Sequence, residues 1–172
     1  MRSNAHNTGK AFESMISNSI NSYRDKLKMK KVDPPTRVVG SGNFRKVIFL
    51  ENPFPDFVGC WTERGGRAVF IECKSTGKPK LPFNSDNGIT VKQMQNLHHW
   101  HSGGAVVFVL WQHNNSVRLV PAPVIFDAET ANTRHSSVKH VDWENSGTLI
   151  QQGIGMCLVD FLPAMHLHWP AR

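Results

Sequence analysis

The apolar positions near the N-terminus fall on one stripe at the spacing of an α-helix. The stripe advances in steps of three and four residues through Phe12, Met15, Ile16, Ile20, Tyr23 and Leu27. This pattern predicts an amphipathic helix over residues 8–28, with Thr8 as its N-cap. Pro34 and Pro35 follow, and they favour an extended connection after the helix.

From residue 37 the apolar period changes to that of β-strands. Two pairs of short segments, each joined by a glycine-containing turn, predict two hairpins: 37–40 with 46–50, and 57–62 with 67–73. A polar loop with proline and lysine is expected over residues 75–89, before the next helix signal.

The second half of the chain begins with a helix that Thr90 caps and that runs to His101. The unbroken apolar run 105–111 is typical of a strand covered on both faces. The remaining expected elements are a strand at 117–120, a helix near 122–131 and strands near 149–161. This order predicts one α/β domain over residues 1–172, with a central mixed β-sheet flanked by helices.

The charge balance points toward a nucleic-acid partner. Lysine and arginine number 20 against 13 acidic residues, which gives a net charge of +7 and a pI of about 9.6. A basic surface attracts phosphate backbones and releases their counterions on binding. The expected DNA contacts are Lys10, Lys28, Lys30, Lys31, Lys78 and Lys80. The alternative is a solvated basic surface without a partner.

Composition excludes several other classes of protein. Hydrophobic residues make up 40% of the chain, which is ordinary for a globular protein. No stretch approaches the ~20 apolar residues that cross a bilayer, so no membrane partner is expected. The polar first residues lack a signal peptide's apolar centre. The three scattered cysteines form no disulfide framework, and we expect a cytoplasmic protein without a nucleotide cofactor.

The segment Val69–Lys74 carries the most informative chemistry. It has the pattern of a buried strand that acquires two charges, and strand alternation places Glu72 and Lys74 on one face and Cys73 on the other. Asp56 lies at the start of the partner strand, so the hairpin brings Asp56 close to Glu72. Charges at the end of a core strand are costly unless they are paired or coordinated.

A divalent cation would relieve the repulsion between two such carboxylates. Mg²⁺ prefers oxygen ligands, so Asp56, Glu72 and the main-chain carbonyl of Cys73 make a suitable partial shell, with Mn²⁺ as a substitute ion. The ion would activate a water as nucleophile, and Lys74 would orient that water or neutralise phosphoryl charge. The alternative is a Glu–Lys pair at a strand end, with Asp56 as a turn residue.

Two further residues are candidates for the same site. Glu13 borders the apolar stripe of the first helix and could reach the ion across the sheet; the alternative is a first-turn glutamate that the helix dipole favours. Gln93 lies early in the second helix and could contact the attacking water or a phosphate; the alternative is a surface glutamine.

Together these motifs resemble the RecU family of Holliday junction resolvases, within the PD-(D/E)xK nuclease superfamily and its restriction-endonuclease-like fold. The resemblance covers about residues 4–111, and its motifs are Asn7–Glu13, Pro34–Thr36, Asp56–Gly59, Glu72–Thr76, Gln93–Leu97 and Gly103–Gly104. One departure is Phe54, where the family usually carries a hydroxyl residue.

The resemblance implies a homodimer that depends on Mg²⁺ and resolves four-way DNA junctions by paired symmetric nicks. By the same matches, Glu13, Asp56 and Glu72 would hold the metal. Lys74 would support the nucleophile, and Gln93 would assist catalysis.

Three alternatives stay open at this point. The first is another nuclease of the superfamily that acts on flaps or duplex DNA. The second is a junction-binding protein without catalysis, against which the intact Asp56, Glu72 and Lys74 argue. The third is a zinc site at His98, His99 and His101, although no nearby cysteine or carboxylate completes its shell. Residues 122–172 receive no assigned role, and their apolar tail would serve dimer contact or core closure.

Overall fold

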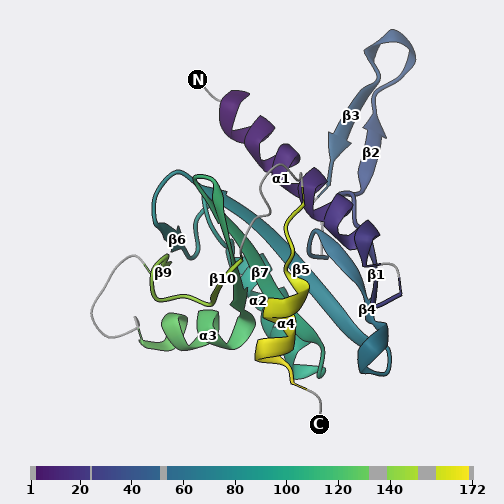
Figure 1. Cartoon of the computed structure of the whole chain (residues 1–172). Helices are drawn as coiled ribbons and strands as arrows, with labels where there is room; N and C mark the ends of the chain where they lie inside the picture. The colour runs from purple at the N-terminus through teal and green to yellow at the C-terminus, as the bar shows by residue number, and fades with distance from the viewer. Residues whose placement is uncertain (1–2, 24, 51–53, 132–138, 151–157, 171–172) are drawn as a thin grey trace.

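A six-stranded mixed β-sheet forms the centre of the chain in a computed structural model that describes residues 3–23, 25–50, 54–131, 139–150 and 158–170 (Figure 1). In spatial order its strands are β1 Leu27–Lys31, β4 Phe57–Trp61, β5 Arg67–Thr76, β7 Val106–His113, β8 Ser116–Pro121 and β10 Thr148–Ile150. β5 and β7 run parallel, whereas the other neighbouring strands of this sheet are antiparallel.

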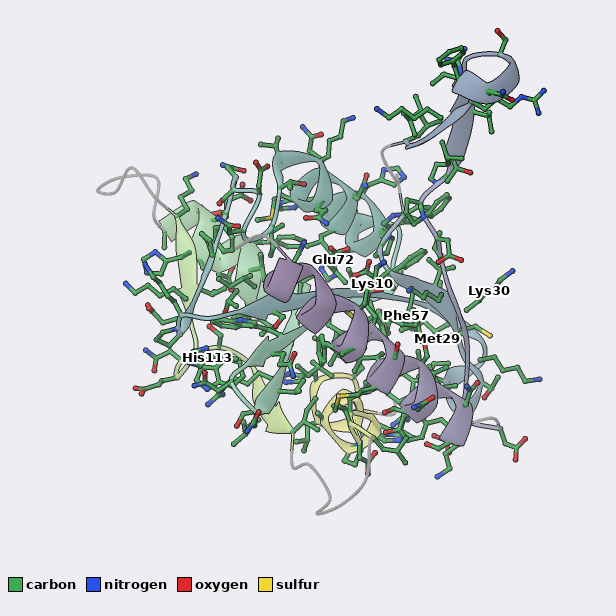
Figure 2. The ribbon with its side chains drawn as sticks, turned by 90° about the horizontal axis from the view of Figure 1, so that it is seen from above. Lys10, Met29, Lys30, Phe57, Glu72 and His113 are labelled. Atoms are coloured by element: carbon green, nitrogen blue, oxygen red, sulfur yellow. The ribbon has the colours of Figure 1, made fainter. Side chains whose placement is uncertain are left out.

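Helices cover both faces of this sheet, as the two views show (Figures 1 and 2). α1 Ser3–Ser22 and α4 Leu162–His168 pack on one face, and α2 Val91–Ser102 and α3 Ala122–Ala131 pack on the other. The expected α/β class with a flanked central mixed sheet is therefore confirmed. Within the described ranges, no helix is long and apolar enough to cross a bilayer.

Strand β7 explains the unbroken apolar run in the sequence. Its residues Val106 to Trp111 are all fully buried. Val106, Phe108 and Leu110 join the core beneath α1, whereas Val107, Val109 and Trp111 join the core beneath α2. Because both faces of the strand are covered, polar residues have no place in it.

Two smaller sheets lie outside the central one. The predicted hairpin at 37–50 is confirmed as β2 Thr36–Val39 and β3 Lys46–Phe49, which project away from the body of the molecule (Figure 1). The predicted loop 75–89 is wrong in part, because β6 Lys80–Pro82 pairs with β9 His140–Asp142. The pairing was hidden because both strands are short and far apart in sequence.

The first helix differs from its prediction at both ends. It begins at Ser3, so Thr8 lies inside it and is not its N-cap, and it ends at Ser22 instead of continuing to residue 28. Leu27 lies four residues after Tyr23 and mimics another helical step. Its partner is in fact Trp61 of β4, and tertiary strand pairing overrides the local pattern.

The C-terminal third is only partly as expected. α3 is confirmed, and of the strands predicted near 149–161 the structure shows β10, while residues 151–157 lie outside the described residues. α4 was missed because it is only two turns long. Leu162 and Met165 of α4 are buried in the core, which supports core closure as the role of the tail.

Strand pairing at Gly59 leaves no room for a side chain. A Cβ there would lie 2.0 Å from the Lys28 carbonyl oxygen and 2.6 Å from the Met29 Cα. Gly59→Ala should lower the free energy of unfolding by about 1–3 kcal/mol, the usual cost of overpacking, and lower the Tm by roughly 2–10 °C. Thermal denaturation tests this against Gly77→Ala, where a Cβ meets nothing within 4 Å. Equal Tm values for the two variants would contradict the prediction.

Candidate active site

Glu72 and Lys74 lie side by side on the face of β5 that α2 covers. Glu72 is 4% exposed, and its Oε1 atom is 3.0 Å from the Lys74 ammonium. Cys73 belongs to the opposite face, where it packs against the core beneath α1. The structure thus confirms the alternation expected for this strand. The buried Glu72 carboxylate has the Lys74 ammonium as its cationic partner.

Asp56 is brought to the same place by the β4–β5 hairpin. It directly precedes β4, whose first residue, Phe57, pairs with Ile71 of β5. The main-chain N–H of Cys73 donates a hydrogen bond of 2.7 Å to Asp56 Oδ2. This bond fixes the Asp56 carboxylate beside the strand that carries Glu72.

Gln93 connects the start of α2 to the two charged residues. Its Oε1 atom accepts hydrogen bonds from the Lys74 ammonium at 2.9 Å and from the Thr90 N–H at 3.0 Å, and its Nε2 donates to Glu72 Oε1 at 2.5 Å. The Thr90 hydroxyl accepts from the Gln93 N–H in return, which completes a capping box. Gln93 therefore helps to cap the start of α2 and also holds Glu72 and Lys74 in place.

Glu13 approaches from α1, on the other face of the sheet, and binds a different cation. Its Oε2 atom is 2.8 Å from the ammonium of Lys31 on β1. This contact raises the pKa of Lys31. Sequence reasoning assigned Lys31 to DNA and missed this partner. Across the ranges that the structure describes, no three His, Cys, Asp or Glu side chains are close enough to hold a metal ion together.

The carboxylates of the site are electrostatically strained. Burial, and then the charge of Glu72, raises the pKa of Asp56 to about 7. Burial also raises the pKa of Glu72, and the neighbouring Lys74 opposes that rise. The Glu13 charge adds to both shifts. Such shifts indicate two carboxyl groups whose ionised forms need further positive charge.

The donor set fits a hard divalent cation. Asp56 and Glu72 offer carboxylate oxygens next to the main chain of Cys73, and Mg²⁺ binds oxygen ligands of this kind. No thiolate is available, since burial holds the pKa of the Cys73 thiol well above its usual value. Asp56 and Glu72 would make the first contacts with the ion.

The comparison with protein families shows which family the chain belongs to. A family model described as Recombination protein U, or RecU, matches residues 7–166. The chain belongs to the RecU family. The match reaches well past the motifs that end near residue 111 and confirms the expected resemblance. The protein is accordingly a nuclease of the Holliday junction resolvase class.

Two other comparisons add little to this assignment. Among solved structures, the chain is similar to Archaeoglobus fulgidus Hjc, a Holliday junction resolvase from an archaeal hyperthermophile. The identity is 17%, the match covers 79% of this chain and 89% of that chain, and the TM-score is 0.47. The comparison with curated proteins found no match.

The histidines of α2 have packing partners in this RecU family member. His98 lies 3.1 Å from a Glu129 carboxylate oxygen and stacks on Phe126, with 3.6 Å between ring centroids. His101 also contacts Phe126 edge-on. These contacts join α2 to α3. The expectation that no carboxylate lies near these histidines is wrong at His98, but the described residues show no three His, Cys, Asp or Glu side chains grouped closely enough to hold a metal ion there.

The lysines predicted to contact DNA lie on three separate elements, and all six are exposed: Lys10 on α1, Lys28, Lys30 and Lys31 on β1, and Lys78 and Lys80 near β6. Among the residues that the structure describes, two of the six form ion pairs with acidic side chains. Lys31 binds Glu13, and the Lys80 ammonium lies 3.8 Å from Asp142. Their contact with DNA stays a prediction.

The raised pKa of Asp56 predicts that the metal-free protein loses stability as the pH rises. The carboxyl titrates at ~3.9 in an unfolded chain and at about 7 in the fold. Between these values the folded state holds the proton, so the free energy of unfolding falls as the pH rises and levels off above about 7. Asp56→Asn cannot ionise and should stabilise the protein at pH 8, by up to ~4 kcal/mol, and much less at pH 5.

Thermal denaturation in EDTA at both pH values measures this difference. Asp86→Asn is the control, because Asp86 is exposed. If Asp56→Asn melts at or below the wild-type temperature at pH 8, the strain assigned to the Asp56 carboxylate is wrong.

Proposed function

We propose that the protein is a Mg²⁺-dependent endodeoxyribonuclease that resolves four-way junctions by paired symmetric nicks. The observation that carries this proposal is the cluster of Asp56, Glu72, Lys74 and Gln93 in a chain of the RecU family. One buried and one half-buried carboxylate with a lysine and an amide beside them are suited to phosphodiester hydrolysis more than to structural support.

Asp56, Glu72 and the main-chain carbonyl of Cys73 would hold Mg²⁺, with Mn²⁺ as a substitute and Glu13 as a further ligand. The ion would supply Lewis-acid stabilisation of the phosphoryl oxygens. The protein's own part is to hold the carboxylates close together, while burial leaves their ionised forms in need of a cation. The Cys73 N–H holds Asp56, and Gln93 fixes one oxygen of Glu72.

Lys74 would act on the reacting phosphate. Its side chain is 16% exposed, so it lies mostly out of bulk water, where a charge acts more strongly. It can orient the attacking water and neutralise charge that builds on the phosphoryl oxygens. The Gln93 carbonyl oxygen holds the ammonium in place for that role.

A homodimer would account for paired cuts, since a two-fold axis presents two equivalent sites to a junction with two-fold symmetry. Recognition would rest on branch shape and phosphate contacts more than on base sequence.

Removal of one carboxylate tests the catalytic assignment. Glu72→Ala should lower the rate of junction cleavage by about 10²-fold or more, as loss of a central electrostatic group does. It should leave junction binding in EDTA intact. Glu144→Ala, at an exposed glutamate, is the matched control. The assay uses an end-labelled four-way junction, a flap and plain duplex, with Mg²⁺, Mn²⁺ or EDTA.

Each result of this assay has a distinct meaning. Paired nicks on the junction that EDTA and Glu72→Ala abolish would support the proposal. Cleavage of flap or duplex in preference to the junction would contradict the substrate. Tight junction binding without cleavage in any divalent metal would favour a protein that binds and does not cut.

Lys30 offers a test of the DNA-binding surface. It lies at the edge of the sheet and points away from the body (Figure 2). If it neutralises a phosphate, Lys30→Ala should lower the slope of log K against log salt by about 0.9. Lys80→Ala should have a smaller effect, because Asp142 already neutralises part of its charge. An unchanged slope for Lys30→Ala would remove it from the interface.

A further inference from the structure

Two lysines hold carboxylates of the site from opposite faces of the sheet. Lys74 binds Glu72 on the α2 face, and Lys31 binds Glu13 on the α1 face. The two ion pairs are not alike. The Lys74 side chain is 16% exposed and is also held by Gln93, whereas the Lys31 side chain is 40% exposed. Lys31 is therefore the cation that can leave its partner more easily.

Backbone contacts fix Lys31 beside Asp56. Lys31 is the last residue of β1 and pairs with Phe57, the residue after Asp56. The N–H of the next residue, Val32, donates to the Asp56 carbonyl oxygen at 2.8 Å. The stem of Lys31 thus starts at the edge of the site, and its ammonium lies on the Glu13 carboxylate.

We propose that Lys31 is a built-in counter-ion that competes with the metal for Glu13. In the metal-free protein, Lys31 neutralises Glu13 and holds it as an ion pair. Glu13 binds the metal only after Lys31 has released it, so the ion pair weakens metal affinity. This inference rests on the proposed function, because it requires that a divalent ion binds at Asp56 and Glu72.

The same exchange would link the metal to DNA. A released Lys31 ammonium lies at the sheet edge, where a phosphate can take it up. A phosphate that binds Lys31 would free Glu13 and raise metal affinity, and by linkage the metal would raise affinity for DNA. The site would then be fully formed only on its substrate.

Isothermal titration of the purified protein with Mn²⁺, without DNA, tests the competition. Lys31→Met removes the ammonium and keeps an apolar stem, so Mn²⁺ should bind about three- to tenfold more tightly, as expected for loss of a partly exposed ion pair. Lys31→Arg should stay close to wild type. Lys30→Met removes the same charge one residue away and should leave the affinity unchanged.

Glu13→Gln separates competition from general electrostatics. In that background Lys31→Met should have no further effect, because the competed carboxylate is gone. Circular dichroism confirms that each variant is folded. Weaker or unchanged Mn²⁺ binding in Lys31→Met would overturn the inference, since a lysine that positions Glu13 for the metal would act in that direction. An equal gain in Lys30→Met would also overturn it.

Glu72→Ala distinguishes failure of the inference from failure of the metal site. If wild type and Glu72→Ala bind Mn²⁺ equally, the metal is not held at this cluster, and the proposed function fails together with the inference. If Glu72→Ala abolishes binding and Lys31→Met does not strengthen it, the metal site stands and the inference alone is wrong.

Discussion

The hydrogen bond from the Cys73 N–H to the Asp56 carboxylate connects the fold to the site. It requires the β4–β5 hairpin in its observed register, with Phe57 opposite Ile71. A slip of one residue in β5 would exchange the faces of Glu72 and Cys73, because side chains alternate along a strand. The parallel pairing of Glu72 with Val109 of the buried strand β7 opposes such a slip. The core therefore determines that Glu72, and not Cys73, lies in the cluster with Lys74 and Gln93.

Burial strengthens the interaction of these carboxylates with a cation, and it also raises the free energy of their ionised forms. A carboxylate in a dry site interacts strongly with a cation, yet without one its ionised form is disfavoured. Lys74 and Gln93 reduce that free-energy cost at Glu72, and the Cys73 N–H together with the Lys74 charge reduces it at Asp56. Burial and the neighbouring Glu72 charge outweigh these contacts and raise the pKa of Asp56 to about 7. The ionised form of Asp56 is therefore unfavourable in the metal-free fold, and the proposed divalent ion would relieve that cost.

The sequence was most informative where local periodicity agreed with the tertiary structure. The period of the hairpin segments predicted both β4 and β5, and alternation within β5 placed Glu72 with Lys74. The Thr90 cap predicted the start of α2, and Gln93 in its first turn followed from that. These features depend on neighbours within about 20 residues, which is the range over which turn and cap signals act. The roles of these residues in catalysis stay predictions.

Long-range pairing accounts for what the sequence did not reveal. β1 continues the helical spacing of α1, so its strand character depends on β4, and β6 depends on β9 in the same way. Because residues 27 and 28 were predicted to be helical, both strand β1 and the contact between Lys31 and Glu13 were missed. A helix through residue 28 cannot place Lys31 beside Glu13, whereas a chain that reverses after Ser22 returns along α1 and brings the two together. Lys31 was predicted to contact DNA because of its charge. The position of β1 at the edge of the sheet places it against Glu13 instead.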